Sequence, residues 1–208
     1  MTSIVAIMPL PFLLNYSNNI SVNSRPLTVL EKQLAVFEKV GVELKKFGLP
    51  VTPKEYAKMA VVVAYCESNL ETTTNAKDGS QGLFQFTAST RRILETGDIS
   101  DDTFGEQVSY HFKYLICTGK ISQIKSVVDL HQLNFAPSSS LKKRVICKSS
   151  EYLSGLDIDK DELITRDDLS LFENNRTKNN KEIHNIYLSI KKNYARAIFN
   201  SDLKTIFN

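Results

Sequence analysis

The sequence predicts a mostly α fold. Capping boxes, in which Thr is followed three residues later by Glu, occur at Thr28 and Thr52 and mark helix starts. After Thr28, apolar residues recur at steps of three and four, which is the spacing of one helix face. No segment alternates apolar and polar residues convincingly enough to predict a strand.

The composition limits the class of protein. The chain has 208 residues, of which 42% are apolar and 24% charged, so it can bury the core of one domain with a small appendage. A net charge of +3 is too small to indicate a nucleic-acid-binding protein. The three Cys show no metal-binding spacing, and we expect buried free thiols. No apolar stretch reaches the roughly 18–20 residues that a membrane span needs.

Two helices are clearest near the start of the chain. The first begins after Thr28, extends for about 20 residues and is ended by Gly48 and Pro50. The second begins after Thr52 and is apolar at every position from Met59 to Cys66, which predicts a helix buried on all sides. It ends at a charged residue, Glu67.

The rest of the chain is predicted less sharply. Residues 69–90 are polar and are expected to form a loop or short hairpin. Further helices are expected to begin at Asp101 or Asp102, at Ser122, near Lys142 (a basic helix) and near residue 179.

Glu67 is the first candidate for catalysis. A carboxyl group that closes a buried helix loses water on several sides, which favours its protonated form. The negative end of the helix dipole acts in the same direction. A Glu that holds a proton beside a loop is suited to act as the general acid in glycosidic bond cleavage. The alternative is a Glu that reaches solvent or pairs with a basic group.

The segment that follows Glu67 resembles the soluble lytic transglycosylase family of the lysozyme-like superfamily. In that family a Glu-Ser pair closes a buried helix, and an Ala and then Gly-Leu-Met-Gln-Phe-x-Pro-x-Thr follow it. The residues at matching spacing are Glu67, Ser68, Ala76, Gly82, Leu83, Gln85, Phe86 and Thr90. Phe84 replaces the Met and Ala88 replaces the Pro, and both keep the apolar character.

Two weaker likenesses lie downstream. Gln107 is similar to the Gln of a later family helix. The segment from Leu130 to Pro137 is similar to the third motif, with His131 where Tyr is expected and Asn134 where His is common. This segment is one residue shorter than the motif, so the identity of the substrate-polarising residue stays open. The resemblance covers about residues 50–150.

The resemblance implies a lysozyme-like domain over residues 28–150 that binds peptidoglycan glycan strands. Glu67 would be the catalytic acid and base, and the product would be a 1,6-anhydro sugar with no cofactor required. Candidate substrate-binding residues are Ser68, Phe84, Gln85, Gln107, His131 and Asn134. Structural roles are the alternative for Ser68 and Gln85, and core packing for at least one of Phe84 and Phe86.

A lysozyme-type muramidase is the nearest alternative activity. A hydrolase usually needs a second carboxylate to handle water. Asp78, Asp98 and Asp101 are candidates, but nothing in the sequence places them opposite Glu67. We therefore favour the transglycosylase.

An acidic segment near the C-terminus resembles an EF-hand or dockerin-type calcium loop. The expected ligands, at positions one, three, five, seven and twelve, are Asp157, Asp159, Asp161, Leu163 and Asp168. Glu162 stands where Gly makes the sharp turn, and Asp168 is shorter than the usual Glu, so both departures should weaken Ca²⁺ binding. The alternative is an acidic loop and helix cap without metal.

The chain termini complete the sequence-based expectation. There is no Lys or Arg before Arg25, so we expect no secretory signal. A wall-cutting chain without a signal resembles virion-associated lysins of bacteriophages. Residues 1–27 would then be an extended arm, and residues 151–208 a small helical appendage, both docking on virion or tail proteins. The alternatives are a structural virion protein whose lysozyme-like domain is inactive, and a calcium-dependent binding module.

Overall fold

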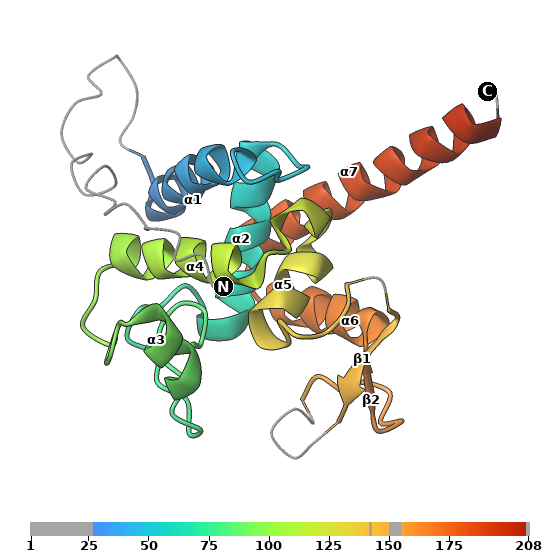
Figure 1. The fold of residues 1–208 in the computed structure, drawn as a ribbon. Coiled ribbons are helices and arrows are strands. Elements are labelled where there is room, and N and C mark those ends of the chain that lie inside the picture. The colour runs from blue at the N-terminus through green and yellow to red at the C-terminus, as the bar shows by residue number, and fades with distance from the viewer. Residues whose placement is uncertain (1–26, 142, 150–154, 207–208) are drawn as a thin grey trace, which may run out of the picture.

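The computed structural model describes residues 27–141, 143–149 and 155–206, with side chains described as far as residue 193. The expected arm therefore lies almost entirely outside the described residues. The mostly α prediction is confirmed (Figure 1). The helices are α1 (Val29–Lys45), α2 (Pro53–Ser68), α3 (Ala88–Leu94), α4 (Phe104–Thr118), α5 (Val127–Phe135), α6 (Arg166–Thr177) and α7 (Lys181–Ile206), with a 3-10 turn η1 (Ile121–Gln123) and strands β1 (Val145–Lys148) and β2 (Leu163–Thr165).

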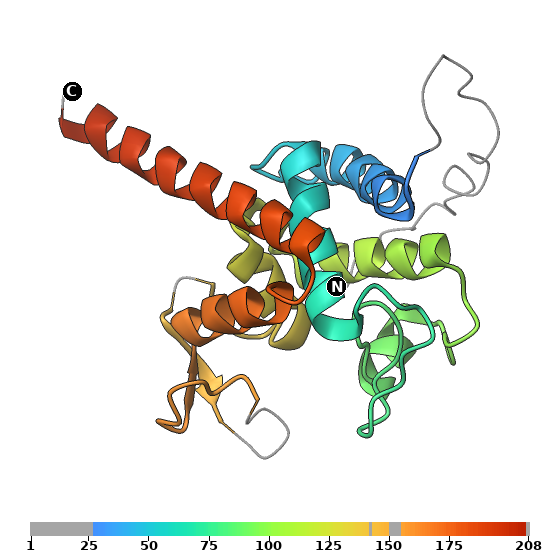
Figure 2. The same ribbon diagram turned by 180° about the vertical axis from the view of Figure 1, so that it is seen from behind.

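Helix α2 is the centre of the molecule. Its start is fixed by the predicted capping box, in which Thr52 and Glu55 exchange hydrogen bonds, with Pro53 in the first turn. Every residue from Met59 to Ala64 is buried, as the sequence predicts, and so is Cys66, but Tyr65 is only half-buried. Helices α1, α5, α6 and α7 all contact α2 (Figures 1 and 2). The helix ends at Asn69, whose left-handed conformation closes the last turn.

The α1–α2 contact depends on a glycine. A Cβ on Gly41 would lie 2.8 Å from the Cα of Pro53, so only Gly permits this approach. The buried face of α1 is formed by Phe37, Val40 and Leu44. These side chains account for the periodic pattern that predicts the helix.

Helix α7 belongs to the same core as α2. Ile183, Tyr187 and Ile190 are buried in the main apolar cluster together with the side chains of α2. The last part of α7 projects from the body (Figure 2). The boundary expected at residue 150 therefore does not separate the core, because α2 is apolar on all sides and needs a covering helix on this side as well.

Three local expectations differ from the structure. Helix α4 is capped by Thr103 rather than by Asp101 or Asp102, because Thr103 and Glu106 form a reciprocal capping box. Helix α5 is capped by Ser126 rather than Ser122, because Ser126 has Asp129 three residues later and forms a reciprocal capping box. The basic helix expected near Lys142 is absent from the described residues that follow, where β1 pairs antiparallel with β2. The β-branched Ile146 and Ile164 pack together in a small second cluster, which favours the strands.

The cysteines and the helix lengths bear on two further expectations. Cys66, Cys117 and Cys147 are free thiols, but Cys117 is exposed, so burial does not hold for all three. Among the described residues, no helix is both long and apolar enough to cross a membrane.

Candidate active site

Glu67 lies in the last turn of α2, and α5 holds its side chain. The Nδ2 of Asn134 donates to Oε1 of Glu67 at 2.9 Å. The Nε2 of His131 lies 3.2 Å from the same oxygen. The Glu67 side chain is 19% exposed, so it still reaches the surface. The structure thus brings together three residues that the sequence singles out.

The position of α5 explains this convergence. His131 and Asn134 are three residues apart on one helix, so their side chains share a face. Asn134 also donates to the backbone oxygen of Phe84 at 3.1 Å, which ties α5 to the loop of the Gly-Leu-Phe-Gln-Phe segment. Asn134 therefore has a fixed amide orientation, with Nδ2 directed at Glu67.

Glu173 is the functional candidate that sequence reasoning missed. It lies on α6, its side chain is 0% exposed, and its Oε1 is 3.1 Å from Nδ1 of His131. The Thr165–Asp168 capping box could have predicted α6. The contact with His131, 42 residues away in sequence, has no local signal.

The electrostatics of this group follow from burial and from the two carboxyl groups. Burial alone would lower the pKa of His131, but hydrogen bonds to Glu173 and Glu67 and the negative charges of both outweigh it and raise the pKa to about 9. Burial raises the pKa of Glu173, and His131 opposes that shift. Both directions mean that the buried pair retains a proton at neutral pH.

The neighbouring thiol is not a nucleophile. Burial raises the pKa of Cys66, and the negative charges of Glu173 and Glu67 raise it further. Nucleophilic cysteines need the opposite shift, because the thiolate is the reactive form. The chemistry available here is therefore proton transfer by carboxyl and imidazole groups.

Three of the expected substrate-binding residues make internal hydrogen bonds. Ser68 is buried and donates to the backbone oxygens of Ala64 and Leu83. Gln85 donates to the backbone oxygen of Gly82 and so closes its own loop. Gln107 is 1% exposed and accepts a hydrogen bond from the Leu83 amide at 2.8 Å. These side chains shape the loop beside Glu67.

Phe84 is placed in the core. Its side chain is 1% exposed and stacks on His111 with ring centroids 3.7 Å apart. Burial lowers the pKa of His111 to about 3, so this ring is neutral. Phe86 is buried as well. The sequence predicts core packing for at least one of these two rings, and in the structure both are packed in the core.

The carboxylates considered as hydrolytic partners make local contacts. Asp78 accepts from the amide of Ser80, and Asp98 from the amide and hydroxyl of Ser100. Within the described part of the chain, no hydrogen bond or ion pair joins Asp78, Asp98 or Asp101 to Glu67.

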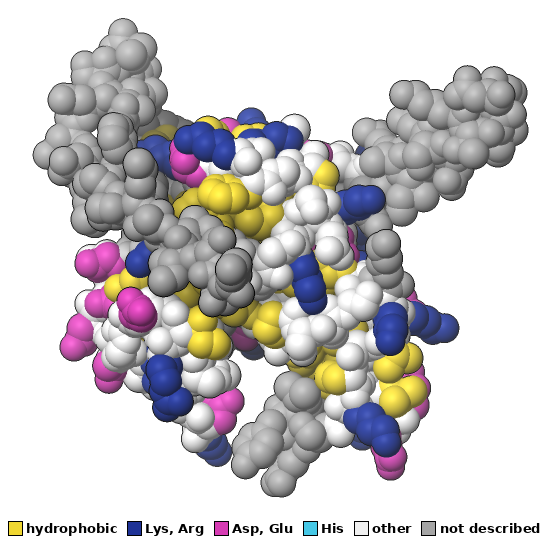
Figure 3. Space-filling view, in the orientation of Figure 1, with side chains coloured by type: hydrophobic (Ala, Val, Ile, Leu, Met, Phe, Trp, Pro, Cys, Tyr) yellow, Lys and Arg dark blue, Asp and Glu magenta, His cyan; other side chains and the backbone are white. Residues whose placement is uncertain are grey.

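Figures 1 and 2 place the C-terminal end of α2 between the part that carries α3 and the part that carries β1 and β2. Figure 3 shows an indentation of the surface between these two parts. A separate cavity of about 480 Å³ lies between α2, α5, α6 and α7, and Glu67 does not line it.

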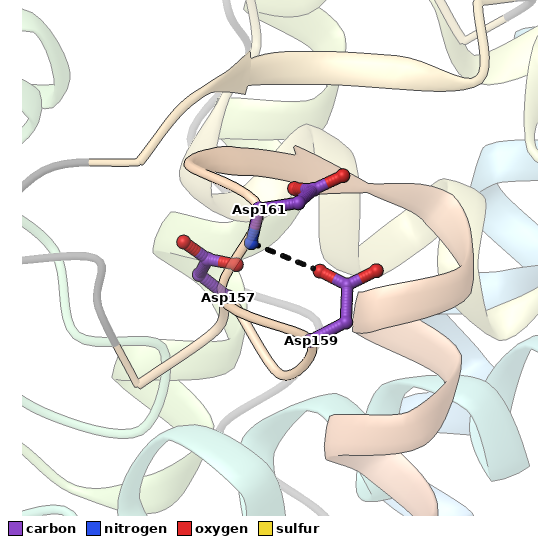
Figure 4. Close-up of side chains that lie close together, drawn as sticks. All are labelled: Asp157, Asp159 and Asp161. Carbon is purple, nitrogen blue, oxygen red and sulfur yellow. Dashed lines mark hydrogen bonds between the residues drawn. The ribbon is translucent and has the colours of Figure 1, made fainter.

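The acidic loop gathers three of its expected metal ligands. One carboxylate oxygen from each of Asp157, Asp159 and Asp161 lies within 4.8 Å of the others (Figure 4). The amide of Leu163 donates to Asp161, and Glu162 has a φ of +68°, at the position where Gly makes the turn in calcium loops. Oδ1 of Asp157 is buried without a hydrogen bond from the described residues.

Asp168 has another role in the structure. Its Oδ2 accepts from the amide and hydroxyl of Thr165, as the cap of α6, and its Oδ1 accepts from the amide of Ile158. These hydrogen bonds hold its pKa below the usual range, although burial opposes them. Asp168 is therefore not part of the carboxylate cluster.

Comparisons with known proteins add no family to this description. No protein-family model, curated protein or solved structure matches the chain.

Proposed function

We propose that the protein is a peptidoglycan lytic transglycosylase in which Glu67 acts first as acid and then as base. The observation that carries the proposal is the fixation of one carboxyl oxygen. Oε1 of Glu67 faces donors from Asn134 and His131, whereas no hydrogen bond from the described residues reaches Oε2. A proton on Glu67 therefore resides on Oε2, which is free to meet a substrate.

The reaction needs one carboxyl group. Oε2 of Glu67 gives its proton to the oxygen between N-acetylmuramic acid and N-acetylglucosamine, and the bond from that oxygen to C1 breaks. The substrate's 2-acetamido group shields the positive charge at C1. The muramoyl 6-hydroxyl then attacks C1 and returns its proton to Oε2. The acid is regenerated and no water is consumed.

Two features support a lysozyme-like site for a glycan strand. Glu67 is 19% exposed and lies in the last turn of a buried helix, whose end is placed between the part that carries α3 and the part that carries β1 and β2 (Figure 1). The glycine at position 82 is needed where it stands, because φ is +76° and a Cβ would collide with Oε1 of Gln107. Gly82 therefore lets the Gly-Leu-Phe-Gln-Phe segment pack closely against Gln107.

Product analysis tests this function against the muramidase alternative. The transglycosylase releases muropeptides that end in 1,6-anhydro-N-acetylmuramic acid, lighter by one water than the reducing products of a hydrolase. The absence of a contact between Glu67 and a second described carboxylate, other than through His131, favours the former. A zymogram on purified peptidoglycan separates both from an inactive structural protein.

The biological setting remains the one that the resemblance implies. We propose a bacteriophage virion- or tail-associated lysin that opens the host wall locally. Binding of the purified chain to isolated virions that lack it, with and without residues 1–26, tests the docking role of the arm.

We also propose that the loop from Asp157 to Asp161 takes Ca²⁺ at millimolar concentration. Oδ1 of Asp157 is buried and has no hydrogen-bond partner in the described part of the chain, which favours a cation there over a plain surface loop. Adding Ca²⁺ should raise the melting temperature through mass action, and Asp157→Ala should abolish the rise. Asp101→Ala, a change at an exposed Asp outside the loop, is the matched control. An unchanged melting temperature at several millimolar Ca²⁺ removes this proposal.

A further inference from the structure

The site contains a buried carboxyl group that the reaction does not use. Glu173 is 0% exposed, and the hydrogen bond to His131 at 3.1 Å is the one that its side chain makes among the described residues. Burying a carboxyl group is strongly unfavourable unless the group is paired with a partner. The contact with His131 is therefore what makes a buried Glu173 tolerable.

The geometry connects Glu173 to Glu67 through one imidazole ring. Nδ1 of His131 faces Oε1 of Glu173, and Nε2 faces Oε1 of Glu67 at 3.2 Å. Asn134 already donates to that oxygen of Glu67, so the oxygen acts as an acceptor and Nε2 must carry a hydrogen. The ring is 2% exposed, so water does not compete for either nitrogen.

We propose that Glu173 is a positioning residue that accepts Nδ1–H of His131 and thereby keeps Nε2–H directed at Oε1 of Glu67. This inference rests on the proposed function for its catalytic consequence. With hydrogens on both nitrogens, the ring is an imidazolium. The ring fixes Oε1 of Glu67 as an acceptor, so Oε2 stays directed at the substrate both when it gives up its proton and when it takes one back.

Several charged groups set the protonation of this ring. Glu67 on α2 and Glu173 on α6 contact it directly and raise its pKa. The cations that act on Glu173 are Arg166 on α6 and Lys191 on α7. Burial and the charges of both glutamates raise the pKa of Cys66 on α2, and Arg176 opposes them. The thiol therefore stays neutral. Tyr114 on α4 has its pKa raised by burial and by Glu67, and it stays neutral too.

Nitrogen NMR of the full chain tests the ion pair without reference to activity. The chain has three His, so the imidazole spectrum is simple, and His131→Gln assigns the signal. In the wild type, both ring nitrogens of His131 should be protonated at pH 7.5 and remain so to about pH 9. Glu173→Gln keeps the shape and removes the charge, so the pKa of His131 should fall below its wild-type value, because burial lowers it and Glu67 alone still raises it. A wild-type ring with one protonated nitrogen at pH 7.5 overturns the proposal, even if the variant does not fold.

Kinetics then test the positioning role. Glu173→Gln should lower kcat roughly 100-fold, the loss expected when one preorganised donor is disturbed, and should leave KM within about twofold because Glu173 does not touch substrate. Glu38→Gln, the same change at an exposed Glu of α1, should leave both constants unchanged. If the wild type and Glu173→Gln have equal kcat, the positioning role is wrong while the proposed function stands. If the wild type cuts no peptidoglycan, the proposed function fails, and with it the catalytic consequence, but the NMR result still decides whether Glu173 holds the ring.

Discussion

At the scale of single residues, the candidate site is a carboxyl group with one oxygen held by two side chains and the other without a donor among the described residues. Asn134 and His131 contact Oε1 of Glu67 through their side-chain nitrogens. Glu173 contacts the other ring nitrogen of His131. The resemblance stated from the sequence singles out Glu67, His131 and Asn134, and these three side chains meet in the structure. It does not single out Glu173, because a buried pair made by two distant helices leaves no local pattern.

The His131–Glu173 pair predicts how stability depends on pH. The folded-state pKa of His131, about 9, lies above its ordinary value of 6.5. Its contribution is therefore fully present below pH 6.5 and is lost as pH rises through about 9. The shift sets an upper limit of roughly 3 kcal/mol on this contribution. Urea unfolding at pH 6, 7.5 and 10 should show the wild-type advantage over His131→Gln shrinking with pH, and an advantage that stays constant contradicts the pair.

At the scale of elements, the sequence predicts the helices that have local capping signals and does not predict the strands, which depend on tertiary contacts. Capping boxes at Thr28 and Thr52 place α1 and α2 at their starts, because these hydrogen bonds are made within one turn. The strands β1 and β2 were not predicted, since they are short and depend on Ile146 and Ile164 meeting across the pair. The start of α6 corresponds to the acidic helix cap that the sequence leaves as the alternative to a calcium ligand, because Asp168 fits both patterns.

The loop beside Glu67 offers a matched pair of glycine substitutions. Gly82→Ala should destabilise the protein by about 1–3 kcal/mol, because φ is +76° and the new Cβ would meet Gln107 and Ile99. Gly79→Ala is the control, since its φ is +80° but no atom lies within 4 Å of the added Cβ. It should cost only the backbone strain, about 1 kcal/mol. Equal losses of melting temperature for the two variants would show that the packing against Gln107 does not matter.

At the scale of the whole molecule, α2 is the central helix on which α1, α5, α6 and α7 pack. It is covered by α1 on one side and by α5, α6 and α7 on others, so the site at its end draws residues from several helices. The apolar run from Met59 to Cys66 predicts this central position directly. The sequence does not show which helices cover it, because amphipathic faces identify a buried side but not its partner.

The place of α7 in the core can be tested by truncation. Deleting residues 179–208 removes Ile183, Tyr187 and Ile190 from the main cluster and uncovers α2. Three buried side chains contribute about 2 kcal/mol each, so the shortened chain should lose cooperative thermal unfolding. A chain that ends after residue 193 keeps all three and should unfold cooperatively. If both truncated chains melt like the wild type, residues 179–208 are a dispensable appendage after all.

The central claim is that Glu67 cleaves peptidoglycan as both acid and base. The most direct measurement is mass spectrometry of peptidoglycan digests by the wild type and by Glu67→Gln, which keeps the size of the side chain but cannot donate or accept the proton. We expect 1,6-anhydro muropeptides from the wild type and a loss of about 10²–10⁴-fold in the variant, with Glu38→Gln as an active control. Reducing ends from the wild type, or full activity in Glu67→Gln, would contradict the claim.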